Sequence, residues 1–321
     1  MKDAMKAFRD LVRILLGPDA CADAKTSFGN ELCILGIDVS VSSRGYRFAP
    51  ADAKVLKWVA QIQAILESPR SVLLPGDASK LAGQLSWACT NAFRAFGRAM
   101  LRPLFDQVSR FDGKISPELR RALSWWDGAL QHGIAEIHPW VADKGEQVHL
   151  FCDASGKLAK LGAAIRVNGD WYYTCMRAPD ELLQQFRHRR DNQIMGLELL
   201  AISMGLGTFR WLLEGRYVVV HCDNSGAEVS VRRGTSRAWD HAQLVHSQLL
   251  FALRHRMSLF VKRVDTTENI ADIPSREDSR QFMWNIGAKF ITPMLADGCV
   301  DPDSWQVLQE RWRFLDTYRR G

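Results

Sequence analysis

Apolar and polar residues follow two different periods along the chain, separated by a segment at 133–145 that is rich in structure breakers. Before this segment apolar residues recur every three to four positions, which predicts helices at 53–66, 78–102 and 116–131. After it, alternating or continuous apolar runs predict strands at 147–152, 161–167, 171–176, 217–222 and 258–264. Periodic stretches predict helices at 193–213, 224–232 and 239–255. A helical part followed by an α/β part is therefore expected.

Turn-forming residues refine this outline. A first helix is expected up to Gly17-Pro18, followed by a hairpin with strands at 32–41 and 46–48 that turns at 42–45. Asn168-Gly169 predicts a tight turn between the second and third strands of the α/β part. That part then reads as three antiparallel strands followed by parallel strands joined by helices.

The expected fold class is α/β, with a mixed five-stranded sheet preceded by a mainly helical domain and a small β-hairpin. We expect four segments, namely 1–50 with a helix and hairpin, 51–135 helical, 146–278 α/β, and 279–321 as a helical extension. In the extension an apolar stripe at helical spacing predicts a helix that docks on the body: Trp305, Leu308, Trp312 and Leu315.

Composition narrows the class of protein. The 321 residues are 47% hydrophobic and 24% charged, and the net charge of +6 permits a polyanionic partner. No apolar stretch approaches the length of a membrane-spanning helix, so no membrane partner is expected. Seven cysteines show neither a Cys-x-x-Cys pair nor zinc-site spacing, which favours an intracellular, reducing compartment: nucleus, cytoplasm or mitochondrion. The basic N-terminal helix leaves a mitochondrial presequence open, but Asp3 and Asp10 argue against it.

Four acidic residues stand in settings that suit a metal site. Asp153 and Asp223 end β-like runs, Glu198 lies off the apolar stripe of its helix, and Asp272 opens a late helical segment. Carboxylates that converge from strand ends and a helix repel one another unless cations lie among them. Each acid has a plainer interpretation as a turn former, an exposed helix residue, a helix cap or a first-turn acid. All four in this order favour a divalent metal site that cleaves phosphodiesters.

The motifs around these acids resemble a known family. CDAS, GLELLA, HCDNSGA and ENIADIPSR, in this order, resemble the RNase H domain of DIRS-type and gypsy-like retroelement reverse transcriptases. Upstream, FGNELCILGIDVSVSSRGYRFAP resembles the hairpin that ends the polymerase palm. SKLAGQLSWACTNAFRAFGRAMLRPLF resembles the thumb, and RRALSWWDGALQHG its connection to RNase H. The chain has no Tyr-x-Asp-Asp motif and no adjacent pair of Asp residues, so no polymerase activity is expected.

The resemblance implies a chemistry and a set of roles. It implies two Mg²⁺ ions, or Mn²⁺, held by Asp153, Glu198, Asp223 and Asp272. Asp153 would bridge both ions, Glu198 and Asp223 would hold the ion on the leaving side, and Asp272 the ion that activates water. The substrate implied is RNA in an RNA–DNA hybrid.

Other polar residues are candidates for contacting nucleic acid. Ser155 and Asn224 would lie near the substrate backbone or the waters of the metal ions, and Arg276 would contact phosphate or pair with a carboxylate. Arg94, Arg98 and Arg102 recur every four residues on the expected helix 78–102, which fits phosphate contacts and a solvated basic face equally well. Arg189 and Arg190 lie in a basic loop before the Glu198 helix.

Three functions remain open from the sequence. The first is a ribonuclease H derived from a retroelement. The second is a non-catalytic RNA-binding scaffold, recruited into a ribonucleoprotein such as a ribosome or spliceosome, which the missing polymerase motif favours. The third is another nuclease of the same superfold, such as a transposase or 3′-exonuclease, which the spacing of the acids disfavours. Cleavage or mere binding of a hybrid distinguishes the first two.

Overall fold

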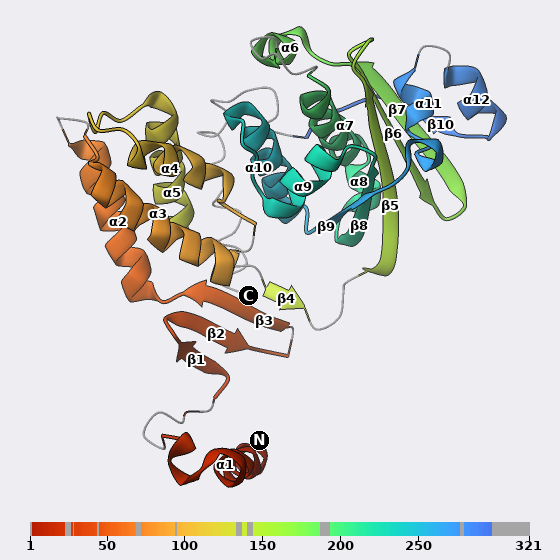
Figure 1. Ribbon diagram of the computed structural model, residues 1–321. Helices are drawn as coiled ribbons and strands as arrows, with labels where there is room; N and C mark the ends of the chain where they lie inside the picture. The colour runs from red at the N-terminus through yellow and green to blue at the C-terminus, as the bar shows by residue number, and fades with distance from the viewer. Residues whose placement is uncertain are drawn as a thin grey trace.

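The computed structural model describes residues 2–22, 27, 29–43, 45–68, 72–93, 95–132, 137–139, 144–186, 193–276 and 279–296. The chain is mixed α/β, with a helical part and an α/β part that each enclose a hydrophobic core (Figure 1). The expected helix over 305–315 lies outside the described residues.

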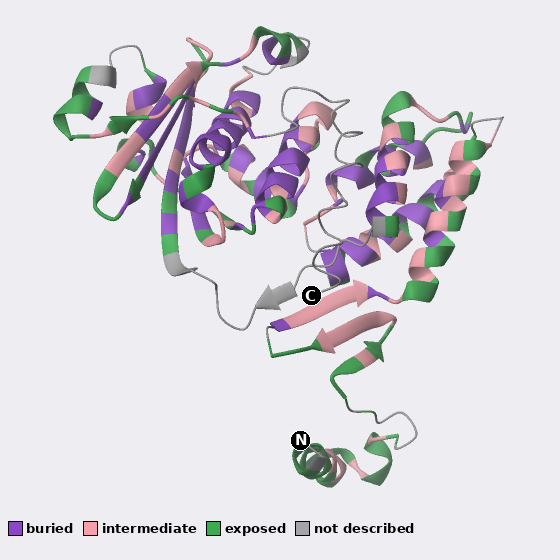
Figure 2. Ribbon diagram, turned by 180° about the vertical axis from the view of Figure 1, so that it is seen from behind, coloured by how far each residue is buried: buried purple, intermediate pink, exposed green. Residues whose placement is uncertain are grey.

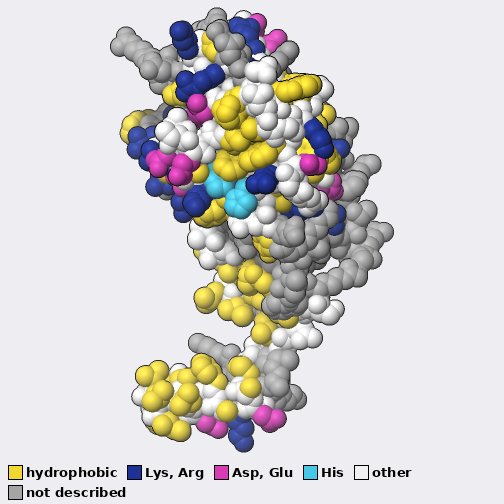
Figure 3. All heavy atoms as spheres, turned by 90° about the vertical axis from the view of Figure 1, so that its right-hand side faces the viewer, with side chains coloured by type: hydrophobic (Ala, Val, Ile, Leu, Met, Phe, Trp, Pro, Cys, Tyr) yellow, Lys and Arg dark blue, Asp and Glu magenta, His cyan; other side chains and the backbone are white. Residues whose placement is uncertain are grey.

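The N-terminal segment forms a small antiparallel sheet. Helix α1 (Lys2–Leu16) and the short helix η1 (Pro18–Ala20) precede strands β1 (Glu31–Ile34), β2 (Ile37–Val41) and β3 (Gly45–Pro50), and β4 (Ile137–Pro139) completes the order β1-β2-β3-β4. The expected single strand at 32–41 is wrong, because Leu35 and Gly36 have φ of 52° and 78° and turn the chain between β1 and β2. Helix α1 exposes an apolar face, with Phe8 63% and Ile14 80% exposed, and Figure 3 shows hydrophobic side chains gathered there.

The helical part consists of α2 (Asp52–Glu67), α3 (Pro75–Ala88), η3 (Cys89–Phe93), η4 (Ala99–Leu101), α4 (Arg102–Val108) and α5 (Pro117–His132). Ser116 caps α5 as expected, since its Oγ accepts a hydrogen bond from the Leu119 N–H at 3.2 Å. The expected helix 78–102 is wrong, because α3 ends at Ala88 and Gly97 turns the chain with φ of 74°. A Cβ at Gly97 would lie 2.5 Å from the Trp126 ring, so only glycine fits this turn.

The α/β part is built on a six-stranded sheet. Strands β5 (Lys144–Ser155), β6 (Lys160–Val167) and β7 (Asp170–Arg177) are antiparallel, while β8 (Arg216–Cys222) and β9 (Ser258–Arg263) extend the sheet in parallel from β5. The turn at Asn168-Gly169 is confirmed, with φ of 53° and 88°. The five-stranded sheet expected from the sequence is wrong, because β10 (Lys289–Phe290) adds a sixth strand parallel to β7 and gives the order β10-β7-β6-β5-β8-β9.

Helices cover the two faces of this sheet unequally. On one face lie α6 (Asp180–Phe186), α7 (Ile194–Thr208), α8 (Arg210–Leu213), α9 (Ser225–Arg233) and α10 (Trp239–Arg254), which share the main core with the strands. On the other face, the segment from η5 (Thr266–Glu268) through α11 (Asp272–Ser275) to α12 (Ser279–Asn285) packs over Ala164 and Tyr173. The layers are visible in Figure 1.

Helix α7 is buried on every side. The expected helix 193–213 is two helices, α7 and α8, and every residue of α7 from Gly196 to Thr208 is buried rather than only one stripe (Figure 2). The C-terminal segment crosses α7, since a Cβ at Gly207 would lie 2.5 Å from the Met294 carbonyl oxygen. Thr208 Oγ1 also accepts a hydrogen bond from the Met294 N–H at 2.9 Å. A polar side chain on α7 is therefore held inside the protein.

Helix α10 joins the two parts of the chain. Leu250 of α10 belongs to the core of the helical part, and the rings of Trp125 and His246 meet edge to face with centroids 4.6 Å apart. Gly234 allows a further close approach, because a Cβ there would lie 2.3 Å from the Ala95 carbonyl oxygen. The helical part thus packs against α10 on the side away from the sheet. The division at 135–146 stays a prediction.

Candidate metal centre

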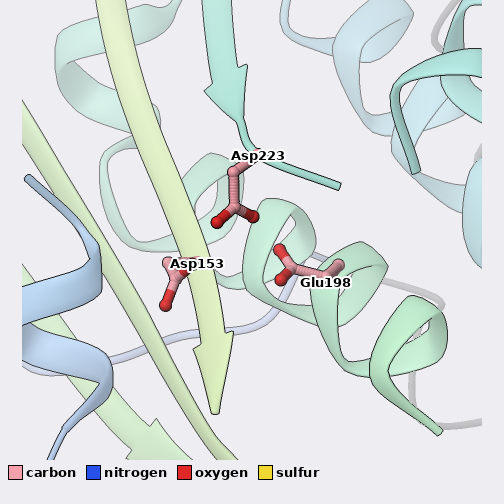
Figure 4. Close-up of side chains that lie close together, drawn as sticks. All are labelled: Asp153, Glu198 and Asp223. Atoms are coloured by element: carbon pink, nitrogen blue, oxygen red, sulfur yellow. The ribbon is translucent and has the colours of Figure 1, made fainter. Parts of the chain in front are cut away.

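Three carboxylates from separate elements meet at one edge of the sheet. Asp153 lies near the end of β5, Asp223 directly follows β8, and Glu198 lies in α7 (Figure 4). One ligand oxygen of each lies within 4.8 Å of the others. Three of the four acids expected to converge are therefore together, although 223 − 153 = 70 positions separate the first from the last along the chain.

Strand register brings the two aspartates together. β5 and β8 are parallel neighbours in which Phe151 pairs with His221. The residues two positions further on, Asp153 and Asp223, therefore project from the same face at the same edge of the sheet. Parallel strands end side by side, and this edge is where open α/β sheets bind ligands.

Close packing of α7 on β5 supplies the third carboxylate. A Cβ at Gly205 would lie 3.0 Å from the Cys152 Sγ and 3.2 Å from Leu150, so this glycine lets the helix approach the strand. Glu198 precedes Gly205 by seven residues, which is two helical turns and places both on one face of α7. The face that packs on β5 thus carries Glu198 to the end of that strand.

Burial perturbs two of the three carboxyl groups. Asp153 is 4% and Glu198 3% exposed. Burial raises the pKa of Glu198 to about 9, helped by the charges of Asp153 and Asp223 and opposed by a backbone hydrogen bond at Ala154. Burial also raises the pKa of Asp153 to about 6; a hydrogen bond from Ser275 opposes this, and nearby Asp223 and Asp272 add to it. The protein therefore holds carboxyl groups where their ionised form is disfavoured.

Neighbouring hydroxyl groups donate hydrogen bonds to two of the three carboxylates. Ser275 Oγ donates to Asp153 Oδ2 at 2.6 Å, and Thr266 Oγ1 donates to Asp223 Oδ2 at 2.7 Å. Glu198 Oε2 is buried and has no hydrogen-bond partner among the described residues. A buried acceptor without a partner costs free energy, so each such group in a native fold calls for an explanation.

A divalent cation fits this arrangement. The three side chains offer only carboxylate oxygens, which are the ligands that hard cations such as Mg²⁺ and Mn²⁺ prefer. A cation would use the unpartnered Glu198 oxygen, favour ionisation of Glu198 and Asp153, and remove the repulsion among the three charges. The triad of Asp153, Glu198 and Asp223 can therefore hold a metal ion.

The fourth acid lies close to the triad without joining it. Asp272 is the first residue of α11, and its Oδ1 accepts a hydrogen bond from Arg276 Nη2 at 2.6 Å. It influences the charge state of Asp153, but its oxygens lie outside the 4.8 Å cluster. The close convergence of all four acids is therefore corrected to a triad with an adjacent ion pair.

A glycine on β6 allows α11, which carries Asp272, to lie close to the sheet. Gly162 pairs with Asp153 across the sheet, and a Cβ at this position would lie 2.6 Å from the Ser275 nitrogen and 2.7 Å from the Ala271 carbonyl oxygen. Only a residue without a side chain allows α11 to lie against the sheet here. Glycine inside a strand is a known signal of such close backbone approach.

The residues predicted to contact nucleic acid lie in several different parts of the structure. Asn224 caps α9, with its Oδ1 accepting from the Ala227 N–H at 3.0 Å, and Ser155 is half-buried where β5 pairs with β6. Arg98 is half-buried, and Arg102 forms an ion pair with Asp106 at 3.1 Å. Arg98 lies in the turn before η4 and Arg102 is the first residue of α4, so their expected place on one helix 78–102 is wrong. Arg94, Arg189 and Arg190 lie outside the described residues.

Several residues at the site were not expected from the sequence. Thr266 and Gly162 have no distinctive local pattern, and Ser275 stands in the ENIADIPSR motif without an expected role. Asn269 is buried and donates to the Cys152 carbonyl oxygen at 3.0 Å, which fastens the segment before α11 to β5. The Asn-x-Ala-Asp…Ser-Arg order did mark this segment, but it did not indicate that Ser275 hydrogen-bonds Asp153.

The open sheet face beside the triad is aromatic. Phe151 and His221 stack with centroids 4.5 Å apart, and His149 Nδ1 lies 2.8 Å from His221 Nε2. Burial, followed by His149 and Lys262, lowers the pKa of His221 to about 4, so this ring is neutral at pH 7. Figure 3 shows histidine and hydrophobic side chains side by side on this surface, with Lys and Arg close by.

The two cysteines next to the acids lie in the hydrophobic core. Cys152 and Cys222 are buried free thiols that face the core shared with α7. Burial raises the pKa of Cys222 to about 12 and that of Cys152 well above its usual value. Both thiols therefore stay protonated at neutral pH, which agrees with the expectation that they are small apolar core residues.

Comparison with models of known protein families and with curated proteins finds no match for this chain. Among the described helices, none combines the length and the apolar character needed to cross a membrane. The functional argument therefore rests on the geometry of the acidic triad.

Proposed function

We propose that this chain is a metal-dependent ribonuclease H that cleaves the RNA strand of RNA–DNA hybrids. The observation that carries the proposal is the triad: three carboxylates with ligand oxygens within 4.8 Å, one of them buried without a partner. The strand order, with three antiparallel strands followed by two parallel ones, agrees with the topology that the resemblance implies. The preference for hybrids comes from that resemblance alone.

The proposed chemistry needs two Mg²⁺ or Mn²⁺ ions, which when bound orient a water and stabilise the leaving oxygen. Asp153, Glu198 and Asp223 would hold the first ion, and Asp272 would contribute to the second. Ser275 keeps Asp153 in place through its hydroxyl, and Thr266 does the same for Asp223. Glu198 must lose its proton when the ion binds, because carboxylates bind metals in the ionised form.

The test is a cleavage assay on a hybrid with a labelled RNA strand in Mg²⁺. We expect RNA cleavage that falls at least about 100-fold in Asp153→Asn, since even residues behind metal ligands change activity 10- to 100-fold. Asp170→Asn is the matched control, because Asp170 is an exposed aspartate paired with Lys289 on the surface. Cleavage that survives Asp153→Asn contradicts the proposal.

The assay also separates the alternative function. A protein that binds the hybrid or RNA without cutting it, in Mg²⁺ and in Mn²⁺, would support the second candidate, a scaffold subunit of a ribonucleoprotein. The net charge of +6 permits binding in both cases, so binding alone does not distinguish them.

A further inference from the structure

The fourth acid is held by a residue on its own helical turn. Asp272 and Arg276 form an i,i+4 ion pair with Nη2 to Oδ1 at 2.6 Å, in which the Asp272 side chain is 25% and the Arg276 side chain 66% exposed. The short charge-assisted bond occupies Asp272 Oδ1 and places a positive charge beside the carboxylate, which weakens the binding of a cation there. In this structure Asp272 is therefore engaged with Arg276 and not with the triad.

Ser275 connects this ion pair to the triad. Its Oγ lies 2.6 Å from Asp153 Oδ2 and 2.9 Å from the Asp272 carbonyl oxygen. A hydroxyl has one proton, so it donates to one of these oxygens at a time. The short contact favours Asp153. The buried Ser275 thereby attaches the segment that carries Asp272 and Arg276 to Asp153, and Thr266 attaches the same segment to Asp223.

Arg276 also presents an exposed cation at this edge. Its guanidinium is mostly exposed, and Lys160 Nζ donates to the Arg276 carbonyl oxygen, which brings a second cation beside it. Guanidinium groups bind carboxylates and phosphates with the same planar donor geometry. A backbone phosphate near the triad would therefore compete with Asp272 for Arg276.

We propose that Arg276 is a phosphate-operated latch on Asp272. In the free protein it holds Asp272 away from the triad. When the phosphodiester backbone of a nucleic acid binds, Arg276 transfers to a phosphate and Asp272 becomes available for a second cation. The inference rests on the proposed function. It also explains an order of binding, in which the second ion binds after the nucleic acid. Arg276 is a positioning residue in this scheme.

The experiment counts Mn²⁺ ions bound per chain by calorimetric titration, without nucleic acid. We expect the wild type to bind one ion at the triad and a second only weakly. Arg276→Gln frees Asp272, so the second ion should bind about fivefold more tightly, as expected for the loss of a largely exposed ion pair. Arg232→Gln is the matched control, because Arg232 forms another exposed i,i+4 ion pair, with Glu228 at 3.1 Å.

A double variant separates the latch from general electrostatics. Removing any cation near the site raises cation affinity slightly, but the latch predicts that Asp272→Asn abolishes the gain caused by Arg276→Gln. In the wild type, a hybrid whose RNA strand carries 2′-O-methyl groups should restore the second ion. The latch is overturned if Arg276→Gln leaves the second affinity unchanged or if the gain survives Asp272→Asn. A wild type that binds no Mn²⁺ overturns the proposed function as well.

Discussion

Glu198→Gln provides the sharpest test of the electrostatics of the triad. Glu198 is 3% exposed, and its pKa of about 9 means that folding without metal requires it to take up a proton at neutral pH. Glutamine has nearly the same shape and carries no charge at any pH. We therefore expect the substitution to stabilise the metal-free protein at neutral and alkaline pH.

The magnitude follows from proton linkage. In the unfolded chain Glu198 has the ordinary value of 4.5, and in the folded protein about 9. The folded state thus binds more protons between these values, so the free energy of unfolding falls as pH rises, by about 1.4 kcal/mol per pH unit. At pH 7 the accumulated cost is about 3 kcal/mol, from the distance between pH 4.5 and 7.

The window from pH 6.5 to 8.5 isolates this residue. Asp153 has a raised pKa of about 6, so it changes the free energy of unfolding with pH mainly below this window. His221 and His246, with pKa lowered by burial to about 4 and 3, add stability only as pH rises to their unfolded values near 6.5. The cysteines with raised pKa act above pH 9. Only Glu198 among these groups changes its contribution within the window.

Urea unfolding followed by the fluorescence of the 11 tryptophans measures the effect. From pH 6.5 to 8.5 the free energy of unfolding of the wild type should fall by about 3 kcal/mol, whereas that of Glu198→Gln should stay level. Saturating Mg²⁺ should remove the fall in the wild type, because the ion binds the ionised triad of the folded state alone. Equal pH slopes for wild type and variant would refute the reasoning.

Three further predictions concern the supports of the site. Gly162→Ala should lower the free energy of unfolding by about 1–3 kcal/mol, because a Cβ would lie 2.6 Å from the Ser275 nitrogen. The control is Gly83→Ala, which adds a Cβ with no atom within 4 Å at an exposed helix position and should raise the free energy of unfolding by about 0.4–1 kcal/mol. Chemical denaturation measures both variants, and changes of the same sign in their unfolding free energies would contradict the packing argument. Ser275→Ala should raise the pKa of Asp153 above about 6, since its hydrogen bond favours the ionised form; carboxyl-carbon NMR titration tests this, and an unchanged pKa would show that the bond is not formed in solution. Asn269→Ala should cost about 1–3 kcal/mol, because the buried Cys152 carbonyl oxygen loses its partner; an unfolding free energy equal to that of the wild type would mean that water replaces the side chain.

Local patterns were sufficient for most of the α/β part. All five strands predicted from apolar alternation are present, because alternation reflects which face of a strand is buried and needs no knowledge of the neighbours. The turn at Asn168-Gly169 was predicted for the same reason, since its backbone angles suit these two residue types. Strand β10 was missed because two residues carry no periodicity and are ordered by pairing with β7.

Contacts between distant segments overrode local preference elsewhere. The stretch 78–102 has helical spacing throughout, yet the chain turns at Gly97, where the Trp126 ring fills the space of a side chain. Similarly, α7 shows an apolar stripe in sequence but is buried all round, because the segment at residues 294–296 and α10 cover the sides away from the sheet. These packing partners lie far away along the chain, so no local window contains the information.

For the acidic site, the sequence alone determined which side chains carry the carboxyl groups and which elements bear them. Tertiary structure decided how near they come: parallel register brings Asp153 beside Asp223, and Gly205 lets the helix that carries Glu198 approach β5. Gly162 lets α11, which carries Asp272, lie against the sheet. The physical reason is that residue type and periodicity are properties of a short stretch, whereas separations of a few ångströms between carboxylates depend on how closely whole elements pack.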